Sequence, residues 1–204
     1  MTAVLKAESA TEAEACLLAG RGVPVFPVKP EHTEDKRPLV RCGFHEATTD
    51  PEKVREWWRR WPDARIGVPT GAAGGKMPLF VLDIDRRDDK DGFDTLERLG
   101  IEIPTTRTHH TPSGGVHYLF RDPGGLGSTA GKIGPGVDTR ADGGYIVWHP
   151  AAGHRIENAR VLAEVPAALL DMLSESKKSS TPAAPINSDR AGGLKQAGLE
   201  LTEA

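Results

Sequence analysis

Cysteine is nearly absent from this chain of 204 residues, which has only Cys16 and Cys42. The two lie far apart and form no CxxC pair, so no structural zinc site is predicted, and the low content indicates a reducing compartment. No apolar run is long enough to cross a bilayer, and no basic segment followed by an apolar one opens the chain. These absences predict a cytoplasmic protein with no membrane partner.

An excess of positive charge is also lacking, because the net charge is −3. A wholly basic nucleic-acid binder is therefore excluded. The charge is uneven, however: residues 66–104 are acidic, and the flanking residues 21–65 and 105–155 are mildly basic. This pattern suits a metal site beside an anionic ligand, although solvated faces of ordinary helices and loops would explain it equally well.

With 38% apolar residues, the chain is long enough for one domain with a buried core. We predict this domain over residues 1–176 and a flexible linker or tail over 177–204, where Ser, Pro, Ala and Gly predominate. Helices are predicted from caps and apolar spacing at 11–20, 50–61, 91–99 and 166–174, with Thr11, Asp50 and Asp91 as N-caps. Strands are predicted at 23–28, 65–68, 79–84, 105–110, 116–121, 137–140 and 145–148.

The apolar strand at 79–84 runs directly into two carboxylates, Asp83 and Asp85. Alternate residues of a strand face the same side, so Asp83 and Asp85 share one face, and Phe80, Leu82 and Ile84 share the other, which would pack on helices. The same parity places polar residues of later strands on that face: His117, Asp138 and Arg140. We therefore expect one sheet with helices on one face and functional side chains on the other.

Carboxylates this close repel each other unless a cation holds them. Oxygen ligands without cysteine favour Mg²⁺ or Mn²⁺, and Asp138 as a third carboxylate allows two ions, an arrangement that assists phosphoryl transfer. Replacing Asp83 by Asn is expected to relieve the repulsion and raise the melting temperature of the metal-free protein. The alternative is that Asp83 and Asp85 are surface residues paired with Arg86 and Arg87.

A glycine turn, Ser113-Gly114-Gly115, precedes His117. Such a turn can offer backbone N–H groups to a phosphate, and His117 can donate to a phosphate oxygen. A plain hairpin turn and an exposed strand histidine would explain the same residues. The glycine-rich segment 69–75 lacks the Lys-Ser/Thr ending of a Walker A motif, so no P-loop is predicted.

Three segments in this order, VLDID, SGGVHYLF and GVDTRADGGYIVWHP, resemble the motifs of the bifunctional primase–polymerase (Prim-Pol) domain of the archaeo-eukaryotic primase superfamily. Upstream segments from FPVKP to IGVPTG are similar to the N-terminal part of that domain, so the resemblance covers about residues 10–175. It implies an α+β fold, in which a palm sheet like an RNA-recognition motif has an open catalytic face and is joined to an N-terminal α/β unit. It also implies a template-directed DNA primase and polymerase that acts in replication of plasmids, phages or mobile elements.

The resemblance also implies roles by position. Catalysis and the binding of two Mg²⁺ or Mn²⁺ ions fall to Asp83, Asp85 and Asp138. Nucleotide binding falls to Ser113, Gly114, Gly115 and His117. Charge and place add Lys132 and Arg140 for the nucleotide, and Lys36 and Arg37 for the template.

The implied partners are a single-stranded DNA template, dNTPs or NTPs, and a helicase domain or subunit. Two other functions stay open on the same residues. One is a metal-dependent phosphodiesterase or nuclease, and the other is a non-catalytic single-strand DNA-binding replication module. The intact acid trio argues against the second, because a DNA binder has no need to gather negative charge.

Overall fold

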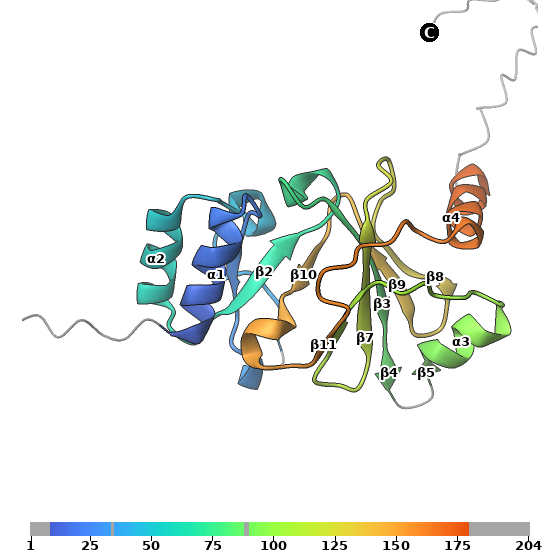
Figure 1. The fold of residues 1–204 in the computed structure, drawn as a ribbon, viewed down its shortest axis with the longest axis horizontal. Helices are drawn as coiled ribbons and strands as arrows, with labels where there is room; N and C mark the ends of the chain where they lie inside the picture. Colours follow the sequence, from blue (N-terminus) through green and yellow to red (C-terminus); the bar gives the residue numbers. More distant parts are fainter. Residues whose placement is uncertain (1–8, 34, 88–89, 180–204) are drawn as a thin grey trace, which may run out of the picture.

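The computed structural model describes residues 9–33, 35–87 and 90–179. Two antiparallel sheets organise these residues (Figure 1). The smaller sheet has three strands in the order β1-β2-β10, and the larger has six in the order β11-β6-β7-β3-β9-β8. The expectation of a single sheet is therefore wrong, because β2 and β10 pair with each other and not with the strands that carry the acids.

The smaller sheet and two helices form an N-terminal unit. Its strands are β1 (Phe26–Val28), β2 (Arg65–Pro69) and β10 (Tyr145–Val147), and its helices are α1 (Ala10–Gly20) and α2 (Pro51–Arg60). Helix α2 begins as predicted, since the Asp50 side chain accepts a hydrogen bond from the Glu52 N–H at 2.9 Å. Helix α1 is instead capped by Ser9, whose Oγ accepts from Glu12 N–H at 3.0 Å, so the predicted cap at Thr11 is wrong.

The larger sheet forms a second unit with two more helices. Its strands are β3 (Leu79–Ile84), β6 (Arg107–His110), β7 (Val116–Arg121), β8 (Thr129–Gly134), β9 (Val137–Arg140) and β11 (Ile156–Glu157), and its helices are α3 (Gly92–Arg98) and α4 (Ala167–Ser179). A separate hairpin joins β4 (Arg86–Arg87) to β5 (Lys90–Asp91). Strand β8 was not predicted, because its sequence TAGKIG contains two glycines and its register with β9 is irregular.

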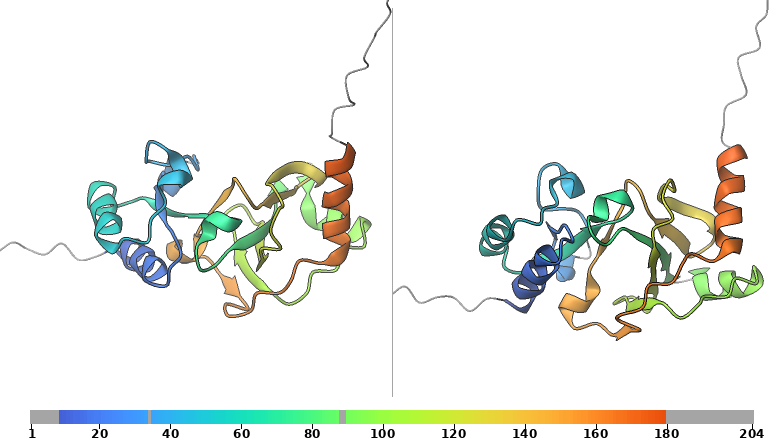
Figure 2. Two further views of the ribbon diagram at one scale, coloured as in Figure 1. Left: turned by 90° about the horizontal axis from the view of Figure 1, so that it is seen from above. Right: turned by 45° about the horizontal axis from the view of Figure 1, so that its top comes forward.

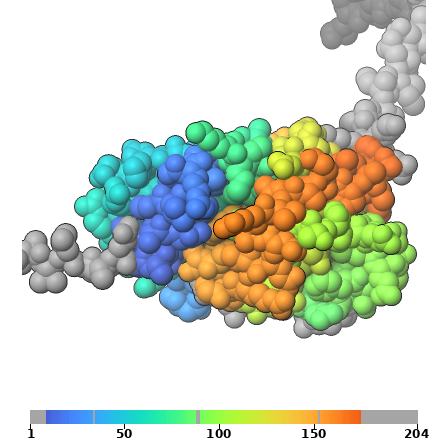
Figure 3. All heavy atoms as spheres, viewed as in Figure 1, coloured from blue at the N-terminus to red at the C-terminus, as the bar shows by residue number. Residues whose placement is uncertain are grey.

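Short 3₁₀ turns link these elements: η1 (Glu31–Thr33), η2 (Gly43–Glu46), η3 (Ala72–Gly74) and η4 (His149–Ala152). Figure 3 shows the chain after β10, in orange, filling the surface between the N-terminal unit and the second unit. Helix α4 stands beside β8, at the end of the molecule away from α1 and α2 (Figure 2). It runs to Ser179, past the predicted tail boundary at 176/177, and residues 180–204 lie outside the described residues.

Strand β3 has a hydrophobic core on each of its faces. Phe80, Leu82 and Ile84 belong to the core under α3 and α4, as strand parity predicts. Leu79 and Val81 point the other way and belong to the core of the N-terminal unit. The face that carries the acids is therefore covered by the N-terminal unit over its first half and becomes accessible only where β3 ends.

None of the helices in the described part of the chain is long and apolar enough to span a membrane.

Candidate active site

Three of the predicted site residues lie side by side on adjacent strands. Asp83 on β3 is the direct partner of His117 on β7 and of Asp138 on β9. Partners in an antiparallel ladder point to the same face, so the three side chains share one site. Arg140, two residues beyond Asp138, joins them, and strand parity is confirmed for these four residues.

Asp83 lies at the centre of a network of ion pairs. Arg140 Nη2 lies 3.4 Å from Asp83 Oδ2 and 3.1 Å from Asp138 Oδ2. His117 Nε2 lies 3.4 Å from the other oxygen of Asp83, and Asp83 is only 7% exposed. Burial by itself would raise the pKa of Asp83, but the His117 contact and the positive charges of Arg140 and Lys36 outweigh it and lower that pKa to about 2.

The donor set suits a hard divalent cation, because carboxylate oxygens on paired strands are the ligands that Mg²⁺ and Mn²⁺ prefer. The set is not preassembled. Asp138 Oδ1 accepts the Gly131 N–H at 2.8 Å, and Arg140 already engages one oxygen of each acid. Within residues 9–33, 35–87 and 90–179 no group of three or more His, Cys, Asp or Glu side chains is arranged to hold an ion. Asp83 and Asp138 therefore fit a cation chemically, with Arg140 as their present partner.

Three adjacent cavities surround these acids. The largest, about 460 Å³, is lined by Asp85 and Asp138 together with Arg87 of the β4–β5 hairpin. The second, about 350 Å³, shares Arg87 with the first. The third, about 50 Å³, is lined by Asp83, His117 and Arg140. It shares Lys36 and His149 with the second. The shared residues make one polar cleft that runs across the ends of the strands.

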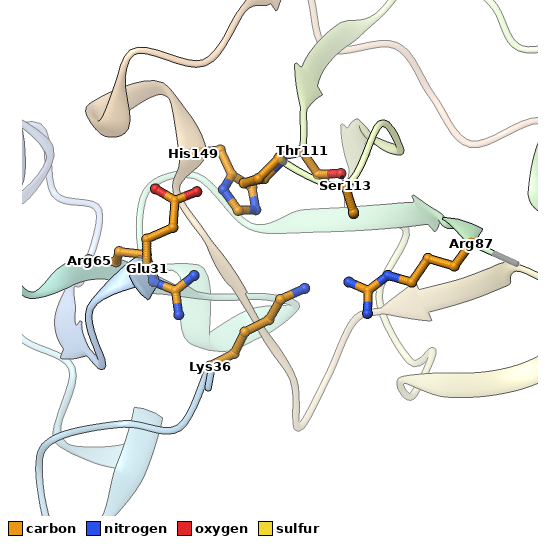
Figure 4. Close-up of a pocket in the computed structure, with 8 residues that line it drawn as sticks. Glu31, Lys36, Arg65, Arg87, Thr111, Ser113 and His149 are labelled. Carbon is orange, nitrogen blue, oxygen red and sulfur yellow. Dashed lines mark hydrogen bonds between the residues drawn. The ribbon is translucent and has the colours of Figure 1, made fainter. Parts of the chain in front are cut away.

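The 350 Å³ cavity is built for an anion (Figure 4). Lys36 points into its middle, with Arg65 on one side and Arg87 on the other. Glu31 is the one carboxylate that lines it, so three cations face one anion among its lining residues. Phosphate groups are the ligands that this balance of charge favours.

The segments 29–33 and 35–37 present Lys36 to the cleft because their backbone is held from behind. The guanidinium of Arg65, a buried residue, donates to the carbonyl of Lys29 at 2.8 Å and to that of Asp35 at 2.6 Å. Tyr145 Oη donates to the carbonyl of Lys36 at 2.9 Å. The backbone of Lys29, Asp35 and Lys36 is thereby fixed to β2 and β10, which leaves the Lys36 ammonium directed at the cavity.

The glycine turn lines the same cavity through Ser113 but not as predicted. The N–H of Gly114 donates to the carbonyl of Thr111 at 3.1 Å, and the N–H of Gly115 donates to Thr111 Oγ1 at 3.1 Å. Both N–H groups are thus engaged within the turn, so the expectation that they would face a phosphate is corrected. Gly114 is required for its positive φ of 83°, and Gly115 because a Cβ there would lie 2.1 Å from the Ile84 carbonyl oxygen.

The other predicted residues have different environments. Arg37 pairs with Asp35 at 2.8 Å, and its side chain is 76% exposed, whereas its neighbour Lys36 reaches the acids' cleft. Lys132 is exposed on β8, next to the buried Ile133. The two residues assigned together to the template are therefore separated, and Lys36 belongs with the nucleotide candidates by position.

Sequence reasoning missed several residues that line the cleft: Glu31, Arg65, Arg87, Tyr145 and His149. Arg65 opens a strand whose five residues are all buried, and a charged residue in such a strand was the available signal. His149 lies two residues after the end of β10, in the WHP segment, and nothing in that segment indicates that it turns inward.

The comparison with known families bears on this cleft. The model of the bifunctional DNA primase/polymerase N-terminal domain, Prim-Pol, matches residues 15–169. The chain belongs to this family. The Prim-Pol match contains every predicted site residue, from Lys36 to Arg140, and both sheets down to the first residues of α4. No curated protein matches the chain. Membership of the Prim-Pol family indicates DNA primase/polymerase activity, with DNA and nucleotides as substrates.

Proposed function

We propose that this Prim-Pol domain is a template-directed nucleotidyltransferase that makes or extends DNA strands during replication of a plasmid, phage or other mobile element. The observation that carries the proposal is the direct pairing of Asp83 with Asp138 and His117 at the edge of a cleft rich in cations. A nuclease would need the acids but not a separate cationic cavity of about 350 Å³ beside them.

In this proposal the cleft divides the incoming nucleotide between two sets of residues. Lys36, Arg65, Arg87 and the Ser113 hydroxyl bind the outer phosphates, since they line the anion-binding cavity. His117, whose Nδ1 has no partner among the described residues, donates to a phosphate near the acids. A single-stranded template, and a helicase domain or subunit acting with this domain, complete the proposed partners.

Asp83, Asp85 and Asp138 would hold two Mg²⁺ or Mn²⁺ ions. Such ions neutralise charge on the attacking and leaving oxygens of a phosphoryl transfer. The contribution of the chain is to fix the carboxylates: β3 pairs with β7 and β9, and the backbone N–H of Asp85 donates to the Gly136 carbonyl at 2.9 Å. Arg140, which engages one oxygen of Asp83 and one of Asp138, would give way to the ions and would then be free to bind the nucleotide.

The test is nucleotide incorporation on single-stranded DNA, with and without a primer, with dNTPs or NTPs, in Mg²⁺ and in Mn²⁺. We expect template-dependent product from the wild type and none from Asp85→Asn. Asp63→Asn is the matched control, because Asp63 is an exposed acid outside the cleft lining, and it should behave as the wild type. Degradation of the template without incorporation would establish a nuclease instead, and DNA binding with neither reaction would establish a non-catalytic module.

A further inference from the structure

His149 is a buried side chain whose hydrogen bonding is incomplete. It opens η4, with Trp148 between it and the end of β10, and only 1% of its surface is exposed. Neither ring nitrogen hydrogen-bonds to a protein group within the residues that the structure describes. Buried polar groups in native proteins nearly always have a partner, which is protein, ordered water or a ligand, so the ring offers hydrogen-bonding capacity to a polar molecule that enters the cavity.

The position of His149 indicates where that molecule lies. The ring lines both the 50 Å³ cavity that contains Asp83 and the 350 Å³ cavity of the three cations. In Figure 4 the His149 ring faces the tip of Lys36 across the 350 Å³ cavity. Its centroid is 5.3 Å from that of His117 and 5.6 Å from that of His154. His149 therefore stands at the junction between the acids and the proposed phosphate site.

The charge state of His149 indicates what kind of group it binds. Burial lowers the pKa of His149 to about 3. The surrounding basic side chains act in the same direction: His117, Lys36, His154 and Arg65. The imidazole is therefore neutral at neutral pH, with one nitrogen that donates and one that accepts.

A phosphate oxygen can only accept, so it can pair with the donating nitrogen alone, and the three cations of the cavity already suit phosphate. A hydroxyl group can donate or accept, so it can pair with either ring nitrogen of the neutral imidazole, and the 50 Å³ cavity is large enough to admit one. The base of the nucleotide is a poorer fit, because the lining of the 350 Å³ cavity consists mainly of charged and hydroxyl side chains.

We propose that His149 binds a sugar hydroxyl of the incoming nucleotide and is a specificity-determining residue for the sugar. The inference rests on the proposed function, because it takes the nucleotide to occupy the two cavities that His149 joins. It adds a recognition element for the sugar to a cleft whose other residues recognise phosphate and metal.

The test compares four ligands on His149→Leu, His149→Gln and the wild type by calorimetric titration in Mg²⁺. The ligands are ATP, dATP, 2′,3′-dideoxy-ATP and inorganic tripolyphosphate. Leucine should weaken ATP binding by about 3- to 10-fold, the range for one neutral hydrogen bond, and leave dideoxy-ATP and tripolyphosphate unchanged. An equal loss for dATP assigns the 3′-hydroxyl, and a loss for ATP alone assigns the 2′-hydroxyl. Glutamine, which keeps a donor and an acceptor, should recover part of the loss.

The matched control is His110→Leu, which removes a histidine that pairs with Glu157 at 2.9 Å on the edge strand pair β6–β11. It should bind all four ligands as the wild type does. The ligand-free melting temperature at pH 7 gives a second readout: His149→Leu should not lower it, because the change removes two unpartnered buried nitrogens.

Three results would overturn the inference: equal weakening of all four ligands, no weakening of any, or a lower melting temperature with unchanged selectivity. Wild-type protein that binds neither the triphosphates nor tripolyphosphate would overturn the proposed function as well. Binding of all four ligands with no dependence on His149 would overturn the sugar contact alone.

Discussion

Replacing Asp83 by Asn should destabilise the metal-free protein, which reverses the sign expected from the sequence. Two neighbouring acids suggested mutual repulsion, but the structure surrounds Asp83 with His117 and Arg140 and leaves it 7% exposed. Its pKa is lowered from 3.8 to about 2. The charged form is therefore favoured in the folded state, and asparagine loses that stabilisation.

The magnitude follows from the shift in pKa. A lowering of this size corresponds to about 2 kcal/mol of unfolding free energy at pH 7, or roughly 4–8 °C in melting temperature for a domain of this size. Because the folded-state pKa of Asp83 is depressed, this contribution is fully present above pH 3.8 and is lost as the pH falls through about 2. The difference between wild type and variant should therefore persist at pH 5 and shrink as the pH falls through about 2.

The assay is thermal and urea unfolding of both proteins in EDTA, with Asp63→Asn as the control for a change in net charge. A melting temperature equal to or above that of the wild type would show that repulsion dominates at Asp83 and would refute the ion-pair network. A second arm uses Arg140→Ala. In that background Asp83→Asn should cost less, because part of the attraction is already gone, and an unchanged cost would show that Arg140 does not stabilise the acid.

Two further predictions concern the neighbours Lys36 and Arg37 and the buried His109. Lys36→Ala should weaken triphosphate binding roughly tenfold or more, as expected for a lost contact to a charged group. Arg37→Ala should change it little, because Arg37 pairs with Asp35 at the surface. Both affinities can be measured by calorimetry, and a larger effect from Arg37 would contradict the placement of Lys36. The pKa of His109 is lowered to about 2, by burial first and then by the charges of Arg107, His117 and His149. His109 therefore stays neutral in the folded protein at pH values below 6.5, where the same side chain is protonated in the unfolded chain. Its share of stability is complete above pH 6.5 and should fall by about 2 kcal/mol at pH 5. His109→Gln should therefore reduce the loss of unfolding free energy between pH 6.5 and pH 5, measured by urea unfolding, by about that amount, while His149 keeps its own share. An unchanged pH dependence would disprove the assignment.

Local patterns in the sequence determined much of the fold. Strand β3 has the predicted bounds of 79–84, and Asp50 and Asp91 cap α2 and α3, since an Asx cap acts over two or three residues of backbone. Parity alone brought Asp83, His117 and Asp138 to one face, because the alternation of a strand does not depend on what covers it. The three ordered motifs also predicted the Prim-Pol family, which the family match confirms.

What covers each face was decided only by the tertiary structure. Burial of Leu79 and Val81 against the N-terminal unit turns an apparently open face into a cleft, and parity carries no information about a second layer. The opposite roles of Lys36 and Arg37 follow from how Arg65 and Tyr145 hold the intervening backbone. These contacts join residues 30 to 109 positions apart, and interactions at that separation depend on the assembled fold and not on the local pattern.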